Sequence, residues 1–166
     1  MAKKKSNKNA KGYFTNDALV ADNRRAKFDY HLEGIFEAGI MLTGTEVKSL
    51  RLGRCSINEA YVGPKNDAIY LLNANITEYS QAGAHLQHQP TRPRKLLLHK
   101  REIDKLMGAV TREGYTIVPV KLYFDKNGRA KIQIALAKGK KQHDKRDAVK
   151  DREWGRSKQR LLRDKN

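Results

Sequence analysis

Three stretches of the sequence concentrate side chains of the kinds that bind nucleic acid. The first is "NRRAKFDYH", residues 23–31, where Asn23, Arg24, Arg25 and Lys27 place amide, guanidinium and ammonium donors close together. Arginine forks match phosphate oxygens in pairs, and an asparagine amide can contact the edge of a base. The same residues could equally be a solvated entry to a strand, so charge alone leaves both interpretations open.

The second stretch is "TRPRKLLLHKR", residues 91–101. Its basic and imidazole-bearing residues are Arg92, Arg94, Lys95, His99, Lys100 and Arg101. Pro90 and Pro93 stiffen the backbone here, so the arginines would lose less conformational freedom on binding. The alternative is a charged rim around a contact that Leu96–Leu98 makes with the core.

The third stretch, "AKGKKQHDKRDAVKDREWGRSKQRLLRDKN", occupies residues 137–166. In a helix its basic spacing places five side chains on one face: Lys145, Arg152, Arg156, Arg160 and Arg163. Trp154 adds an aromatic surface on which an unpaired base can stack. Apolar anchors are few and Gly155 disfavours a helix, so we expect this tail to be disordered when free and to fold on contact. A tail that only solubilises the protein is the alternative.

Signals for catalysis and metal binding are weak. Cys55 has no base predicted beside it, so we interpret it as a partly buried structural thiol. His85 and His88 are three residues apart, but they lie in a predicted loop without other ligands, and we interpret them as surface histidines. Neither G-x-x-x-x-G-K-[ST] nor G-x-G-x-x-G occurs. We therefore predict a protein that is not an enzyme, with no catalytic residue, metal or cofactor.

The charge balance favours a polyanionic partner. The 166 residues carry 35 Lys+Arg against 18 Asp+Glu, a formal net charge of +17. Much of the excess lies in a lysine-rich arm at residues 1–11 and in residues 138–166. A single cysteine is typical of the reducing cytoplasm, and no apolar run approaches the ~18 residues of a membrane span.

Hydrophobic periodicity predicts the elements that would position these residues. Alternation in twos predicts strands, listed by range: 28–42 with a slip near Gly34, 56–63, 68–80, 115–124 and 130–139. "PKND" and Asn127-Gly128 are expected to be hairpin turns. Helical patterns cover 45–53, with Thr45 as the cap, and 95–114, although "RKLLL" at its start could be a strand end.

About six strands with one long and one short helix predict a mainly β fold. We expect a small antiparallel barrel of the oligonucleotide-binding (OB) type, flanked by two or three α-helices, an architecture that often binds nucleic acid. The predicted boundaries are a disordered basic arm over residues 1–20, the barrel over 21–137 and the basic tail over 138–166.

Several blocks together resemble a known family. "NRRAKFDYHLEGIFEAGIMLTGTEVKSLRLG", "PTRPRKLLLHKREIDKL" and "LAKGKKQHDKRDAVKDREW" are similar to the small protein B family, the transfer-messenger-RNA-binding proteins of bacterial ribosome rescue. The resemblance runs from about residue 20 to 163. The combination of "GKKQHDKR" with "EVKSLR" is specific to that family, whereas either motif alone is not.

The resemblance implies a cytoplasmic, monomeric RNA-binding protein that delivers transfer-messenger RNA (tmRNA) to stalled ribosomes for trans-translation. The barrel would bind the tRNA-like domain, and the tail would become helical in the decoding centre and empty mRNA channel. Alanyl-tRNA synthetase and elongation factor Tu with GTP would be indirect partners. From the residues alone, a generic basic ribosomal or single-strand RNA-binding barrel remains the alternative.

The resemblance also implies two sets of site residues. The tmRNA set is Asn23, Arg24, Arg25, Lys27, Glu37, Tyr61, Arg92, Arg94, Lys95 and Leu97. The ribosome set is Lys138, Lys140, Lys141, His143, Asp144, Lys145, Arg146, Arg152, Trp154, Arg156, Arg160 and Arg163. Because Glu37 is acidic, we expect it to hydrogen-bond a base or sugar, or to hold a neighbouring arginine, rather than to touch phosphate.

Overall fold

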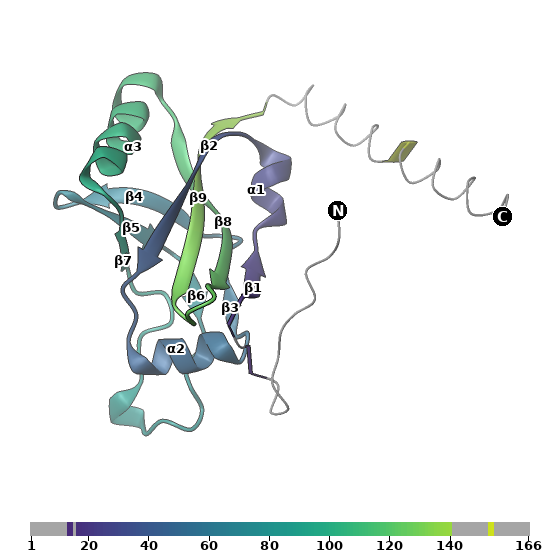
Figure 1. Ribbon diagram of the computed structural model, residues 1–166, viewed down its shortest axis with the longest axis vertical. Coiled ribbons are helices and arrows are strands. Elements are labelled where there is room, and N and C mark those ends of the chain that lie inside the picture. The colour runs from purple at the N-terminus through teal and green to yellow at the C-terminus, as the bar shows by residue number, and fades with distance from the viewer. Residues whose placement is uncertain (1–12, 15, 141–152, 155–166) are drawn as a thin grey trace, which may run out of the picture.

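The computed structural model describes residues 13–14, 16–140 and 153–154 (Figure 1). Its elements in chain order are β1 (Ala18–Asp22), α1 (Arg24–Asp29), β2 (Tyr30–Ile40), α2 (Gly44–Arg51), β3 (Cys55–Ser56), β4 (Tyr61–Lys65), β5 (Ala68–Leu72), β6 (Asn75–Ile76), the 3-10 turn η1 (Ala84–Leu86), β7 (Arg94–Leu97), α3 (Lys100–Glu113), β8 (Thr116–Phe124) and β9 (Ala130–Gly139).

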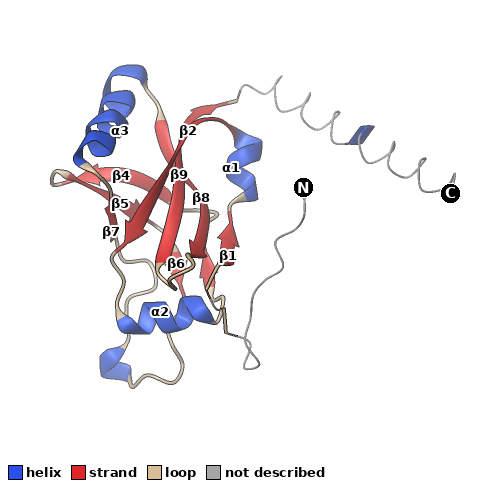
Figure 2. Ribbon diagram, in the orientation of Figure 1, coloured by secondary structure: helices blue, strands red, loops and turns tan. Residues whose placement is uncertain are grey.

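The main sheet closes on itself. Strands β8, β4, β5, β7, β2 and β9 pair in that order, and β9 pairs again with β8, so that the described strands form an antiparallel barrel. Closure removes exposed strand edges within this ring. β1 is added outside the ring, beside β8. Figure 2 shows α2 at one end of the barrel and α3 at the other. The prediction of a small OB-type barrel with flanking helices is confirmed.

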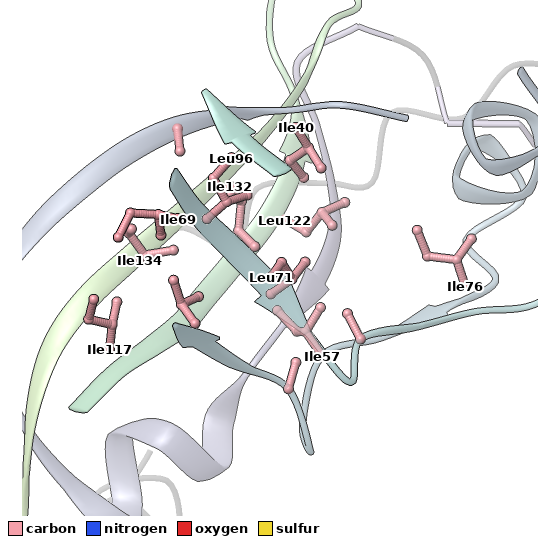
Figure 3. Packing of buried hydrophobic residues seen from close by; sticks show 14 of the residues in the cluster. Ile40, Ile57, Ile69, Leu71, Ile76, Leu96, Ile117, Leu122, Ile132 and Ile134 are labelled. Atoms are coloured by element: carbon pink, nitrogen blue, oxygen red, sulfur yellow. The ribbon is translucent and has the colours of Figure 1, made fainter. Parts of the chain in front are cut away.

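Alternating side chains from the barrel strands fill its interior. Ile117, Leu122 and Ile132 are almost completely buried in this core, beside Ile69 and Leu71 of β5 (Figure 3). β2 supplies the long strand that the alternation predicts. Its pairing with β9 shifts between Glu33 and Ile35, where Gly34 has φ of 61°, so the predicted slip is a β-bulge.

Both predicted hairpins are present, although the first turn is shorter than predicted because Pro64 and Lys65 belong to β4. Asn66 and Asp67 connect β4 to β5 with φ of 46° and 56°, the left-handed values that a tight two-residue turn requires. Gly128, with φ of 74°, lies in the turn between β8 and β9. The sequence Asn-Asp is compatible with positive φ because both short side chains tolerate that region.

The predicted disordered arm over residues 1–20 is wrong at its C-terminal end. Phe14 is buried, and its N–H donates to the Arg51 carbonyl at 2.5 Å. The ring of Phe14 lies so close to Gly53 that an added Cβ there would be 2.6 Å away. β1 begins at Ala18 and pairs with β8. Both segments are short and lie among polar residues, so their periodicity is weak. Phe14 is held by contacts with Arg51 and Gly53, whereas β1 is held by β8.

Other boundaries also differ from the predictions. Residues 24–29 form α1, where the alternation predicted strand from 28. Thr43, rather than Thr45, caps α2, because its capping-box partner Glu46 is three residues on. The segment that was ambiguous between strand and helix is strand at Arg94–Leu97 and helix from Lys100. Residues 56–63, predicted as one strand, contain only the end of β3 and the start of β4.

Candidate nucleic-acid interface

Asn23 shapes the segment that carries the first arginines. Its side-chain oxygen accepts a hydrogen bond from the Ala26 N–H at 2.9 Å and caps α1. Its amide nitrogen donates to the carbonyls of Ile57 at 3.2 Å and Pro119 at 3.0 Å. Pro119 lies where the β8 register shifts, so Asn23 satisfies a carbonyl at this irregularity. Asn23 is therefore buried and positions α1, rather than presenting its amide to a ligand.

The charged residues of α1 face outward. The Arg24 side chain is 91% exposed, and its closest acid, Asp22, is 4.0 Å away. Arg25 is held more firmly, by Glu59 at 2.8 Å and Asp29 at 3.3 Å. Exposed pairs of this kind contribute little to stability, so they leave these guanidinium groups available to an RNA phosphate at small cost.

Tyr61 lies beside Arg25. Both residues, with Tyr30 and Thr116, line a shallow hollow of about 280 Å³. Tyr61 is 51% exposed and offers a ring for stacking. Lys27, which pairs with Asp22 at 3.5 Å, is also exposed on α1. The structure thus brings four of the predicted residues into one region, the α1 surface: Arg24, Arg25, Lys27 and Tyr61.

Glu37 lies in a second group, with two residues that the sequence analysis did not select. Lys131 forms an ion pair with it at 3.2 Å, and the Tyr123 hydroxyl donates a hydrogen bond to its carboxylate. The hydrogen bond from Tyr123 is the main cause that lowers the pKa of Glu37, and Lys131 adds to it. Glu37 is therefore an anion that fixes a lysine and a tyrosine on the outer face of the sheet.

Leu97 belongs to the same group. It is 53% exposed and lies over Gly39, where an added Cβ would be 3.3 Å from the Leu97 Cβ. Leu97, Arg129 and Lys131 line a hollow of about 470 Å³. We call Glu37, Leu97, Tyr123 and Lys131 the Glu37 surface.

The two surfaces lie toward opposite ends of β8. Thr116 and Val118 line the hollow of the α1 surface, whereas Phe124 lines that of the Glu37 surface. Eight residue steps separate Thr116 from Phe124, or about 25 Å along a strand. The predicted tmRNA set is therefore divided, and a single small ligand could not touch both parts.

Arg94 and Arg92 do not form the basic patch that the sequence predicted. Arg94 is 0% exposed, and its guanidinium donates to Glu46 at 2.8 Å and to the carbonyls of Ala74 at 2.7 Å and Pro90 at 2.8 Å. Arg92 binds the same carboxylate with two nitrogens, at 2.8 and 2.6 Å. The inclusion of Arg94 among RNA contacts is thus contradicted by its burial.

Burial of Glu46 raises its pKa, but hydrogen bonds from Arg92, the Thr43 N–H and Arg94 outweigh this effect and hold the pKa below its ordinary value.

Alternation along β7 explains which residues of the second stretch are exposed. Arg94 and Leu96 point inward, whereas Lys95 and Leu97 point outward and are exposed. Lys95 therefore remains accessible to a ligand.

His88 and Cys55, which the sequence analysis considered for metal binding and catalysis, have structural roles. His88 is buried, and its ring nitrogens lie 2.9 Å from the Thr45 hydroxyl and 2.9 Å from the Ile76 carbonyl, so the surface interpretation was wrong for this residue. His85 is exposed in η1. Burial raises the pKa of Cys55 to about 12, and the interpretation as a partly buried thiol is confirmed. Among the described residues, no cluster of three His, Cys, Asp or Glu could hold a metal.

The root of the predicted tail is described. Lys138 is exposed at the end of β9, and the Lys140 ammonium donates to the Lys27 carbonyl at 3.2 Å. Trp154 is helical and 70% exposed. The other predicted ribosome contacts lie outside the described residues: Lys141, His143, Asp144, Lys145, Arg146, Arg152, Arg156, Arg160 and Arg163.

Barrel and surfaces together define a small basic OB-type protein with exposed Arg, Lys and Tyr side chains, the class that binds nucleic acid. The family model described as SmpB protein matches residues 20–164. The chain therefore belongs to the SmpB (small protein B) family. Within the described part of the chain, no helix is both long and apolar enough to cross a membrane.

Individual relatives cover most of the chain. It is 59% identical over 152 residues to an SsrA-binding protein of Rhizorhabdus wittichii, an alignment that spans 92% of this chain and 94% of the relative. It is 59% identical over 145 residues to an SsrA-binding protein of Afipia carboxidovorans, spanning 87% and 92%. A solved structure described as "tmRNA-SmpB: a journey to the center of the bacterial ribosome" matches with a TM-score of 0.61 and 42% identity, covering 78% of this chain and 93% of that one.

Proposed function

We propose that this protein binds the tRNA-like domain of tmRNA and delivers it to stalled ribosomes for trans-translation. The observation that carries the proposal is the match of residues 20–164 to the SmpB family, with relatives named SsrA-binding protein at 59% identity. The net charge of +17 and the exposed arginines of α1 agree with an RNA partner. The protein would act by positioning RNA, without a catalytic step of its own.

On the barrel, we assign the RNA contacts to both surfaces. Arg24 and Arg25 would bind phosphates, Lys27 would add charge, and Tyr61 would stack on a base or sugar. At the Glu37 surface, the carboxylate would hold Lys131 toward a phosphate, and Leu97 would cover an apolar face of the RNA. Because the surfaces lie toward opposite ends of β8, we expect them to contact different parts of one folded RNA.

For the tail, we propose contacts with the decoding centre and empty mRNA channel. His143, Asp144, Lys145 and Arg146 would form the part nearest the decoding centre. Trp154 and the basic residues at positions 152, 156, 160 and 163 would follow the channel. Lys138 and Lys141, at the tail root, would add charge near its entrance. We further propose a monomer that works in the cytoplasm, where charging by alanyl-tRNA synthetase and delivery by elongation factor Tu with GTP act on the bound RNA.

The first test uses the intact chain and a chain that ends at Lys140. This end point preserves all of β9 and its contact with α1, which an end at Lys138 would cut. One assay measures binding to the tRNA-like domain, and the other measures rescue of ribosomes stalled on mRNA without a stop codon. We expect binding to survive and rescue to be lost. If the shortened chain rescues as well as the intact one, the tail assignment is wrong.

A competition assay separates this function from that of a generic single-strand-binding barrel. The intact protein should prefer the tRNA-like domain over unstructured RNA of equal length at the same salt concentration. If about six phosphates are neutralised, affinity should fall by about 10³ between 50 and 200 mM salt. Equal affinity for both RNAs would favour the generic alternative.

A further inference from the structure

The chain leaves the barrel in contact with the C-terminal end of α1. β9 ends where Gly139 pairs with Tyr30. The next residue, Lys140, is tied twice to the helix. Its backbone N–H donates to the Asp29 carbonyl at 3.0 Å, and its ammonium donates to the Lys27 carbonyl at 3.2 Å. These bonds anchor Lys140, the third residue of the tail, to the helix.

The chemistry of a helix end favours this contact. The last carbonyls of a helix have no partner within the helix and carry a partial negative charge. A lysine ammonium can donate to such a carbonyl and is attracted by that charge. Lys140 therefore supplies both a donor and a positive charge where α1 needs them.

α1 is itself fixed to the barrel, so it can serve as a reference point. Asn23 bonds its N-terminal end to β8 and to the Ile57 carbonyl. Ala26 is buried, and it packs in a small cluster with Val118 of β8 and Ala137 of β9. A residue bonded to the end of α1 is thus held relative to the whole barrel.

We propose that Lys140 is a positioning residue that sets the direction in which the tail leaves the barrel. By bonding to α1, it keeps the start of the tail in a fixed relation to the α1 surface. The start of the tail would then be fixed relative to an RNA that is bound through Arg24 and Arg25. This assignment removes Lys140 from the residues that touch ribosomal RNA, and it rests on the proposed function for the role of the tail.

The direct test measures the tail root in the free protein. In a Cys55→Ala background, spin labels at Lys126→Cys, in the β8–β9 turn, and Gln142→Cys report the distance between barrel and tail root. Lys140→Met removes the ammonium while keeping the length of the side chain. Lys138→Met, at an exposed position two residues earlier, is the matched control, and Lys140→Arg keeps a cationic donor.

We expect Lys140→Met to broaden the distance distribution, whereas Lys138→Met and Lys140→Arg leave it close to that of the parent. In the functional assays, without labels, Lys140→Met should bind the tRNA-like domain within about twofold of the wild type but rescue about two- to fivefold more slowly, the size expected for one charge at a helix end. Lys140→Arg should restore the rate.

Two results would overturn the proposal: an unchanged distance distribution in Lys140→Met, or an equal broadening in Lys138→Met, which would reveal a general charge effect. Failure of the wild-type protein to bind or rescue would instead count against the proposed function. The distance measurement would still decide the role of Lys140, because it needs neither RNA nor ribosome.

Discussion

Two short arginine-rich stretches, "NRRAK" and "TRPRK", look alike in the sequence but occupy opposite environments in the fold. Arg24 extends into solvent and makes a loose, exposed ion pair with Asp22. Arg94 lies in the interior, bonded to a carboxylate and to backbone carbonyls. Both stretches are similarly rich in positive charge, so charge density does not separate a binding surface from a structural centre.

The difference comes from elements elsewhere in the chain. Glu46 is presented by the first turn of α2, 48 residues before Arg94 in sequence. β7 directs Arg94 inward because alternate residues of a strand face opposite sides. Among the residues that the structure describes, no buried acid is paired with Arg24. An arginine therefore becomes structural where a second element delivers its counter-ion, and it stays available where none does.

Replacement of Arg94 should give the largest effect. Arg94→Ala leaves the buried Glu46 carboxylate with one arginine fewer and exposes the carbonyls of Ala74 and Pro90 to an unfilled space. We expect the free energy of unfolding to fall by about 3–5 kcal/mol, measured by urea denaturation. Arg24→Ala is the matched control and should change it by no more than about 0.5 kcal/mol. Equal effects of the two variants would remove the distinction between the stretches.

The α1 arginines should show the converse behaviour. Arg24→Ala with Arg25→Ala should weaken binding to the tRNA-like domain by about tenfold, since hydrogen bonds to charged groups are being lost. The slope of log affinity against log salt should decrease by about two. Binding titrations at several salt concentrations measure both quantities. A double variant with wild-type affinity and slope would show that these arginines do not contact phosphate.

The pH dependence of stability should show whether ionised Glu46, bonded to Arg92 and Arg94, stabilises the fold. The pKa of Glu46 is lower in the folded protein than its ordinary value of 4.5. Its ionised form therefore stabilises the fold fully above about pH 4.5, and this contribution is lost as pH falls through the lower, folded-state pKa. The difference in unfolding free energy between wild type and Glu46→Gln should shrink as pH drops below 4.5. A difference that is constant with pH would contradict this assignment.

The smallest effect is expected in the tail. Lys145→Ala with Arg146→Ala should leave affinity for the tRNA-like domain within about threefold, because distant sites contribute independently. The same titration measures this, and rescue should be impaired in parallel. A large loss of affinity would show that the tail, and not the barrel alone, binds the tRNA-like domain.

Local sequence signals predicted the parts of the fold that local chemistry determines. Alternation located β2, β8 and β9, Gly34 indicated the bulge, and Asn127-Gly128 indicated the hairpin. β1 and α1 were missed because their stability depends on distant parts of the chain: β1 pairs with β8, and Asn23, the cap of α1, donates to the carbonyls of Ile57 and Pro119. Tertiary partners of this kind leave no periodic pattern.

The candidate site divides in the same way. Exposed residues such as Arg25 and Leu97 were selected from charge and family resemblance. Lys131 and Tyr123 were not, because their approach to Glu37 depends on the register of three strands. Asn23 and Arg94 were selected for their donors, but those donors are used inside the protein. Donors that bind a ligand can be told from donors that bond inside the protein only when the buried acceptors are known, and these depend on the fold.

Closure of the barrel has a consequence for how the chain is made. The strand that seals the ring, β9, ends at Gly139, and it pairs with β2 near the beginning of the chain. Contacts between such distant segments form slowly, since the intervening chain must first be ordered. During synthesis the ring stays open until β9 is available, because β9 pairs with both β2 and β8. A copy cut short before β9 would keep unpaired strand edges, which promote aggregation.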